Sequence, residues 1–386
     1  MTKIALSLLG NEENWHAGLV YIISLLRALQ MINDSLSDFA LVVLAEEKSM
    51  PQELNNLAQE RIRYPTYQRW TVPWFLDQAA RKILRHDLNR SRFLARHQVN
   101  VIAFGEAPRG SKIPWLSWLP DFQHIRLPEM FSPEEHAKRN DSFFRIAATS
   151  SRILLLSDSV KRDFESFAPP YAHKARVVRP ASYISPTVYE TSPKSVADAY
   201  HLPEKFIYVP NQFWKHKNHE AVFRAVRVLK EQGLEVVVAC SGNLIDYRHP
   251  NYFSRLLQLA SHLGIRSQIA FLGLIPREHV FALIRQSLCV LNPSLFEGFG
   301  LASDEARSLG KPALLSDIDA HREQNPPGAI FFNPRDHEEL AKKMAEVWRE
   351  NIPGPDPEVE LKAKAGLDDR MKAFGEAFMS AVKEVL

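Results

Sequence analysis

A short glycine-containing loop flanked by two glutamates carries the clearest chemical signal in the sequence. Gly298 and Gly300 follow an apolar run and precede a helical pattern that contains Glu305. Backbone N–H groups at such a turn can approach an anion at the positive N-terminus of a helix, which suits phosphate. Glu297 precedes Glu305 by about 12 Å of helix axis, room for a ligand with two separated hydroxyl-bearing ends. A nucleotide sugar fits this spacing, and a tight turn with solvated carboxylates is the alternative.

The sequence around this loop resembles the retaining glycosyltransferases of family 4, which have the two-domain GT-B fold. The segment that carries Glu297 and Glu305 looks like the E-x7-E motif of that family, and the similarity continues through the Ser-Asp pair at 316 and 317. Further segments resemble other motifs of the family, namely 208–219 ("y.gqfwphKNH"), 271–273 (the nucleotide-base turn) and 118–128 ("PDFQH..lP"). Together the matches cover most of residues 115–340, and their combination is more specific than any one of them.

The resemblance implies a role for each matching residue. Glu305 would bind the ribose hydroxyls and Glu297 a hydroxyl of the donor sugar, while Lys217 would neutralise the diphosphate, a charge for which a lysine point charge is suited. The remaining donor-binding candidates are Lys215 as a second cation, the loop backbone of Gly298, Phe299, Gly300 and Leu301, and the base turn at Gly273 and Leu274.

Two positions depart from the pattern of the family. Gln212 stands where many members carry an arginine five residues before the lysine, which weakens the expected charge clamp. Near the N-terminus, Trp15-His-Ala-Gly18 replaces a Gly-Gly loop, so the approach of Gly18 to the donor is less certain than in the family.

Candidates for the chemical step come from the first half of the chain. The resemblance implies that His124 contacts the donor sugar near the reacting carbon and that Asp121 orients either His124 or its loop. A structural histidine is the alternative for His124. No metal and no cofactor is expected, because a helix N-terminus and a lysine can stabilise a departing diphosphate. Asp317 and Asp319 mimic a metal-binding D-x-D motif, and we interpret them as a coincidental match. The implied mechanism is front-face substitution, in which the leaving phosphate oxygen helps to deprotonate the acceptor.

Alternating apolar runs and helical patterns predict the elements that must position these residues. Short runs such as 3–9, 39–44, 206–209 and 288–291 alternate with helical periodicity, which favours parallel sheets covered on both faces. We therefore predict an α/β chain of the GT-B type, with two Rossmann-like doubly wound domains facing an interdomain cleft. The predicted parts are an acceptor-side domain at 1–185, a linker at 186–203, a donor-binding domain at 204–366, and a helix at 367–386 that packs on the first domain.

Composition narrows the class of protein. With 386 residues, 45% of them hydrophobic and 24% charged, the chain is globular and long enough for two to three domains. Cys240 and Cys289 form neither a disulfide framework nor a zinc cluster and suit a cytosolic protein. No membrane span or signal peptide is expected. The basic run 81–97 either contacts an anionic membrane surface, giving a peripheral location at the inner face, or forms a solvated helix face; nucleic acid is not expected.

We thus predict a cytoplasmic, metal-independent hexosyltransferase. The resemblance implies transfer from a nucleotide sugar, UDP-glucose or a related UDP-hexose first and GDP-mannose second, to a glycan or lipid-linked saccharide in surface polysaccharide synthesis. A nucleotide-sugar epimerase of the same fold and a non-catalytic sugar-nucleotide binding protein remain alternatives. A dehydrogenase is disfavoured because residues 9–13 lack the dinucleotide fingerprint.

Overall fold

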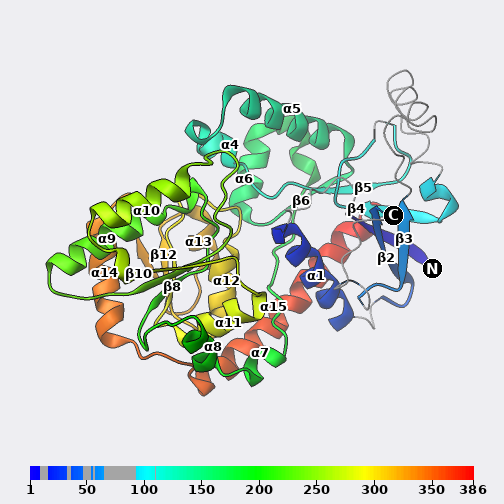
Figure 1. Ribbon diagram of the computed structural model, residues 1–386. Coiled ribbons are helices and arrows are strands. Elements are labelled where there is room, and N and C mark those ends of the chain that lie inside the picture. Colours follow the sequence, from blue (N-terminus) through cyan, green and yellow to red (C-terminus); the bar gives the residue numbers. More distant parts are fainter. Residues whose placement is uncertain (9–15, 33–35, 47–53, 55–56, 65–92, 109) are drawn as a thin grey trace. The chain divides into compact units, whose positions relative to one another are not determined.

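The chain forms two compact units in the computed structural model (Figure 1). The structure describes all residues except 9–15, 33–35, 47–53, 55–56, 65–92 and 109. Unit 1 comprises Met1–Phe122, Pro133–Tyr183 and Asp369–Leu386, and unit 2 comprises Gln123–Ser132 and Ile184–Asp368.

Unit 1 is built on a parallel sheet of seven described strands in the order β3-β2-β1-β4-β5-β6-β7. The strands are β1 (Thr2–Ser7), β2 (Phe39–Glu46), β3 (Glu60–Tyr64), β4 (Val99–Ala103), β5 (Trp115–Trp118), β6 (Arg152–Leu155) and β7 (Ala175–Val177). The helices given for this unit are α1 (His16–Met31), α5 (Pro133–Thr149), α6 (Asp158–Phe167) and the 3-10 helix η4 (Pro169–Lys174). Ser157 caps α6 by accepting a hydrogen bond from the N–H of Val160 at 3.2 Å, the role for which serine is favoured at this position.

Unit 2 contains a second parallel sheet, of six described strands, in the order β10-β9-β8-β11-β12-β13. The strands are β8 (Ile207–Val209), β9 (Val238–Ser241), β10 (Ile269–Gly273), β11 (Val290–Asn292), β12 (Ala313–Ser316) and β13 (Ile330–Phe332). The helices are α4 (Gln123–Arg126), α7 (Thr187–Glu190), α8 (Pro193–Ala199), α9 (His219–Glu231), α10 (Tyr252–His262), α11 (Arg277–Gln286), α12 (Leu301–Ser308), α13 (Asp319–Gln324) and α14 (His337–Glu350), with 3-10 turns η3 (Pro128–Met130), η5 (Lys215–Lys217) and η6 (Arg266–Gln268).

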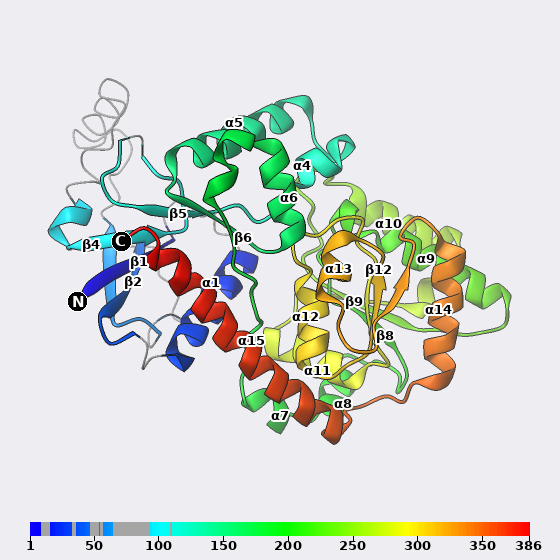
Figure 2. The same cartoon turned by 180° about the vertical axis from the view of Figure 1, so that it is seen from behind.

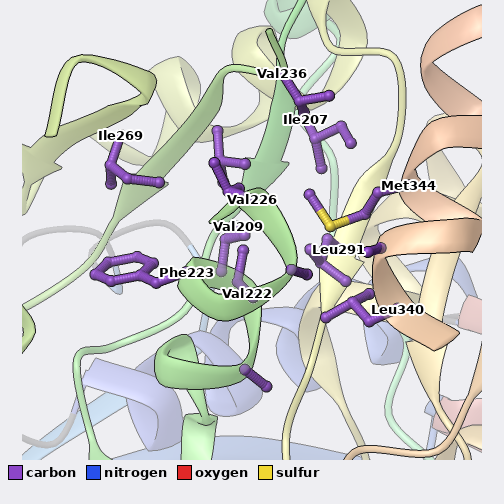
Figure 3. Close-up of a cluster of buried hydrophobic side chains, with 14 of the residues drawn as sticks. Ile207, Val209, Val222, Phe223, Val226, Val236, Ile269, Leu291, Leu340 and Met344 are labelled. Atoms are coloured by element: carbon purple, nitrogen blue, oxygen red, sulfur yellow. The ribbon is translucent and has the colours of Figure 1, made fainter. Parts of the chain in front are cut away.

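The strands of unit 2 are mostly apolar because they form the core of this unit. Side chains from β8, β11, α9 and α14 meet in one buried cluster (Figure 3), which includes Ile207, Leu291, Phe223 and Met344. Strands β8, β9, β11 and β12 are buried along their whole length, as expected for a parallel sheet with helices on both faces. The predicted doubly wound α/β class is therefore confirmed.

The last helix, α15 (Pro357–Lys383), is continuous (Figure 2), and the boundary between the units falls within it. Its C-terminal part packs in unit 1, where the ring of Phe374 lies 5.2 Å from that of Tyr21 and the ring of Phe378 lies 6.3 Å from that of Phe104. Gly375 lies against α1, since a Cβ there would come within 3.0 Å of the carbonyl oxygen of Ala28. This part of α15 is thus buried against α1, the helix that follows β1.

The segment predicted as a linker is helical. Residues 186–203 contain α7 and α8, and both helices belong to unit 2. Arg285 of α11 holds this segment, because its guanidinium donates to the carbonyl oxygens of Val188 at 2.7 Å and Thr191 at 3.1 Å. Prolines at 186 and 193 suggested an extended linker from sequence, whereas Pro193 lies in the first turn of α8, where proline is tolerated.

A carboxylate just past α15 gives a testable contribution to stability. Glu384 Oε2 accepts hydrogen bonds from Arg176 Nε at 2.8 Å and Arg152 Nε at 2.9 Å. The bond from Arg176, ahead of that from Arg152, lowers the pKa of Glu384 to about 2. Because the folded pKa lies below the unfolded one, this stabilisation is present above about pH 4.3 and is lost as the pH falls toward 2.

We expect Glu384→Gln to lower the free energy of unfolding by about 1 kcal/mol at pH 7, the upper end for a partly exposed ion pair. Denaturant titrations at pH 7 and at pH 3 measure the difference, which should shrink at the lower pH. Glu376→Gln, at an exposed position on the same helix, is the matched control and should have no effect. Equal stabilities of the Glu384 variant and the wild type at pH 7 would contradict the assignment.

Candidate functional site

The predicted donor-binding residues lie mainly at one edge of the unit 2 sheet. Strands β8 and β11 are neighbours, and the strand order runs in opposite directions from this pair, which makes it the topological switch point where open α/β sheets bind ligands. The loops that follow these two strands touch, because the N–H of Leu295 donates to the carbonyl oxygen of His216 at 2.8 Å. Asn211 Nδ2 also donates to Asn292 Oδ1 at 3.0 Å and joins the strand ends.

The loop after β11 presents an open helix N-terminus. Gly300 precedes α12 with φ +89°, a left-handed conformation that favours glycine, and it provides no side-chain cap. Within the described chain, the N–H groups of Leu301 and Ala302 donate to no acceptor. Gln324 fixes the turn by donating from Nε2 to the carbonyl oxygen of Gly300 at 3.1 Å. Such an uncapped end can receive an anion.

The helix itself begins later than the spacing argument assumed. Because α12 starts at Leu301, Glu297 lies in the loop and only Glu305 lies on the helix. The 12 Å estimate applied the helical rise to all eight residues between them, whereas only the part from Leu301 onward is helical. The turn at Gly298 to Gly300 sets the position of Glu297 instead.

Glu297 and Lys217 form a nearly buried ion pair. Lys217 Nζ donates to Glu297 Oε1 at 2.6 Å, and the two side chains are 15% and 11% exposed. Ser294 Oγ reaches the same carboxylate oxygen at 2.6 Å. Burial alone would raise the pKa of Glu297, but Lys217, His321 and the Ser294 hydroxyl outweigh it and hold the pKa below its ordinary value. The structure therefore brings two predicted residues together as a charged pair beside the open helix end.

Glu305 lies deeper and carries the opposite shift. Its side chain is 4% exposed, and among the described residues only Arg277 bonds it, from Nη2 to Oε1 at 2.5 Å. Burial raises the pKa of Glu305, although Arg277 partly offsets this effect. A carboxylate with one oxygen engaged keeps acceptor capacity for a ligand hydroxyl.

His321 is a residue of this site that sequence reasoning missed. Its side chain is fully buried, and its Nδ1 lies 2.9 Å from the carbonyl oxygen of Ser316, so Nδ1 carries the proton. Burial lowers the pKa of His321, although the nearby carboxylate of Glu297 partly offsets this effect. Its Nε2 edge packs on the turn, since a Cβ on Gly300 would come within 3.1 Å of it. No motif or spacing in the sequence indicates His321 or Arg277.

Gln212 and Lys215 do not join the ion pair. Gln212 Oε1 accepts a hydrogen bond from the N–H of Asn243 at 2.6 Å, so this side chain holds the loop after β9. The exposed side chain of Lys215 lines a separate hollow of about 420 Å³, together with Arg248, His249 and Arg255. The expected second cation therefore lines a hollow to which neither Glu297 nor Glu305 contributes.

The predicted base turn ends β10. Gly273 has φ +67°, a conformation that favours glycine, and its carbonyl oxygen accepts from the N–H of Gly242 at 2.8 Å. The next residue, Leu274, is 65% exposed. This turn follows the strand two places from β8 in the same sheet, at the same edge as the other loops.

The remaining predicted residues fall in different units. Asp121 belongs to unit 1, where its Oδ1 lies 3.9 Å from Arg139 Nη1, and Gly18 is buried in α1 of the same unit. His124 belongs to unit 2, is fully buried in α4, and its ring centroid lies 6.2 Å from that of Phe131. The roles expected for these three residues stay predictions.

The two aspartates that resemble a metal-binding D-x-D motif, Asp317 and Asp319, pair with arginines. Arg322 donates to both carboxylate oxygens of Asp317 at 2.6 Å, and Arg126 donates to Asp319 at 3.0 Å. Across the residues that the structure describes, no group of three or more metal-binding side chains occurs. Both carboxylates therefore form ion pairs with arginines of the chain.

The basic run is mostly outside the described residues. Of the predicted run 81–97, positions 81–92 lie in the part that the structure does not describe. Among the helices that are described, none is long and apolar enough to cross a membrane.

Comparisons with known proteins agree with this geometry. Residues 197–365, which carry the switch-point loops, match the family model described as Glycosyl transferases group 1. The chain also aligns over its full length with the solved structure of HepE from Anabaena in complex with UDP and glucose, with a TM-score of 0.67, 15% sequence identity and full coverage of that chain. The chain has the GT-B fold.

Two curated relatives match parts of the chain. The serotype-specific mannosyltransferase WbdA from Escherichia coli is 33% identical over 156 residues, which are 39% of this chain and 18% of that protein. The O-antigen chain mannosyltransferase RfbU from Salmonella typhimurium (strain LT2) is 24% identical over 185 residues, which are 47% of this chain and 50% of that protein. The chain thus matches a fifth or less of the first relative and half of the second.

Proposed function

We propose that the protein is a retaining glycosyltransferase that moves a hexose from a nucleoside diphosphate sugar to a glycan or lipid-linked saccharide. The Lys217–Glu297 pair beside the uncapped end of α12 carries this proposal. A diphosphate bound there would receive backbone N–H groups and an ammonium, the groups that stabilise a departing phosphate. Glu305 would accept from the ribose at the buried end of the same site.

The chemical step needs no group beyond the two substrates. The acceptor oxygen forms a bond to the anomeric carbon as the bond from that carbon to the phosphate oxygen breaks. The leaving diphosphate takes the acceptor proton on the same face, which retains the configuration. Lys217 and the α12 end would balance the charge that develops on the leaving oxygen, and His124 would contact the sugar.

The mannosyltransferase names of the relatives favour a mannosyl donor. The O-antigen chain in the name of RfbU supports a role in surface polysaccharide assembly. UDP-glucose or another UDP-hexose, predicted from the sequence, remains the competing donor. The deciding experiment incubates the protein with UDP-glucose, UDP-galactose and GDP-mannose and measures slow hydrolysis and thermal stabilisation. One donor should be hydrolysed and should raise Tm, and Glu305→Ala should abolish both effects. Stabilisation by none of the donors, or equal stabilisation of the variant, would refute the donor site.

Two other outcomes would identify a different function. A nucleotide-sugar epimerase would isomerise the donor without an acceptor. A non-catalytic binding protein would be stabilised by a donor without any turnover. Gln212 favours this candidate, because it stands where many members of the family carry an arginine and its Oε1 is engaged by the Asn243 backbone. Analysing the same panel of donors for isomerised products, beside hydrolysis and thermal stabilisation, separates both from a transferase.

We further propose that transfer is independent of a metal ion. Asp317 and Asp319 are already paired with Arg322 and Arg126, so a cation would have to compete with two guanidinium groups. Turnover is expected to stay the same in excess EDTA, and Asp317→Asn is expected to keep it within about twofold, since exposed ion pairs contribute little. Loss of turnover in EDTA that Mg²⁺ or Mn²⁺ restores would contradict the proposal and assign the two aspartates to a metal.

A further inference from the structure

The side chain of Arg248 is almost fully buried although it lies in the loop after β9. It is 4% exposed, and its nearest acidic partner is Asp246, whose Oδ1 lies 3.9 Å from Arg248 Nε. Asp246 is itself occupied by the N–H groups of Lys215 and Arg248, both at 3.0 Å. A guanidinium that is removed from water without a close carboxylate must be stabilised by other contacts.

Those other contacts come mainly from the segment Gln123–Ser132. Arg248 Nη1 donates to Gln123 Oε1 at 3.1 Å. The same guanidinium lies 4.5 Å from the ring centroid of Phe131, closer than to those of Tyr247 at 5.5 Å and Trp214 at 5.8 Å. A cation over aromatic rings at these distances is attracted to them. One side chain therefore contacts both ends of this ten-residue segment.

This segment stands apart from its neighbours in the chain. Phe122 and Pro133, which flank it, belong to unit 1, whereas Gln123–Ser132 belongs to unit 2. His124 follows Gln123 directly, and its ring lies against that of Phe131. The two residues that Arg248 holds are thus the sequence neighbour and the ring neighbour of His124.

We propose that Arg248 is a positioning residue that fixes the segment Gln123–Ser132 on the donor-binding unit and thereby sets the place of His124. The part of this inference that concerns turnover rests on the proposed function, because it assigns His124 to the transfer step. The part that concerns the segment stands on the contacts alone. Arginine suits the task because its planar cation can stack on a ring and donate a hydrogen bond at once.

Hydrogen exchange tests the structural part. In the wild type, the segment 123–132 must break its contacts with Arg248 before it can open locally. Arg248→Gln lacks these contacts, so we expect the amides of residues 123–132 to exchange at least about tenfold faster than in the wild type. Arg255→Gln is the matched control. Arg255 is exposed and lines the same hollow as Arg248 and Lys215, and among the described residues it forms no hydrogen bond or ion pair with the segment 123–132. Exchange that is unchanged in Arg248→Gln, or equally raised in both variants, would overturn the proposal.

Kinetics test the positioning part. We expect kcat of Arg248→Gln to fall by about tenfold or more with KM for the donor within about twofold, since misplacing a catalytic group costs rate rather than binding. Arg248→Lys should recover part of kcat. If Arg248 acts through His124, its substitution has no further effect once His124 is replaced. The kcat of His124→Ala and that of the double variant His124→Ala/Arg248→Gln should therefore be equal. A rise of KM alone, or additive losses, would overturn the positioning role. If the wild type turns over no donor, the proposed function fails while the exchange experiment still decides the role of Arg248.

Discussion

Replacing Lys217 with methionine is expected to lower the rate of sugar transfer by about 100- to 1000-fold, the loss typical of removing one group that stabilises developing charge. The variant also leaves Glu297 buried without its cation, and removing one partner of a buried pair costs about 3 kcal/mol of stability. Transfer is measured with saturating donor, and stability by denaturant titration. Unchanged transfer would contradict the assignment of Lys217 to the diphosphate.

A double variant separates the two effects of this substitution. In Lys217→Met/Glu297→Gln the buried charge is gone, so stability should return toward that of the wild type while transfer stays low. The pH dependence of stability provides a further test of the Lys217–Glu297 pair. Because Lys217 holds the pKa of Glu297 low, the pair stabilises the fold above about pH 4.3 and this contribution is lost as the pH falls. The stability deficit of Lys217→Met should therefore shrink toward pH 4.

Replacing Glu305 with glutamine is expected to weaken binding of the nucleoside diphosphate by about 10- to 100-fold, as expected for losing hydrogen bonds to a charged group. The fold should not suffer, because burial raises the pKa of Glu305 and its ionised form is already disfavoured in the folded state. Calorimetric titration measures the affinity, and thermal unfolding at pH 7 should give a Tm no lower than that of the wild type.

A modified ligand tests whether the ribose is the group that Glu305 binds. The 2′-deoxy nucleotide should bind the wild type more weakly than the parent nucleotide and should bind Glu305→Gln about as well as the parent does. Equal discrimination by both proteins would place the ribose elsewhere. Since the carboxylate titrates at a raised pKa, wild-type affinity should fall as the pH drops through that value, whereas the variant should show no such step.

Much of the fold could be predicted because its strands are buried on both faces. Strands β8 and β11 are buried throughout, and helix α9, which follows β8, has apolar residues at helical spacing. The edge strands β7 and β13 are only partly buried, so they lack the fully buried runs of β8 and β11. The helices at 187–199 were missed because the prolines at their starts suggested a linker.

The residues of the candidate site could be predicted where they lie close together in a sequence motif. They could not be predicted where the fold brings in a side chain that is distant in the sequence. Glu297 and Glu305 lie in one motif, and Lys217 lies in another that resembles a family pattern. Arg277 reaches Glu305 from the preceding helix, and His321 reaches the turn from the helix after β12, so only the folded sheet brings them in. The orientation of Lys215 likewise depends on Asp246, which binds its backbone.

One binding measurement tests the central claim most directly. Wild-type protein and the Lys217→Met/Glu297→Gln double variant are titrated calorimetrically with UDP and with GDP in the presence of EDTA. If the loops after β8 and β11 hold a nucleotide diphosphate, one of the two nucleotides will bind the wild type with a micromolar Kd and the double variant at least about tenfold more weakly. Binding of neither nucleotide, or equal binding to both proteins, would contradict the account.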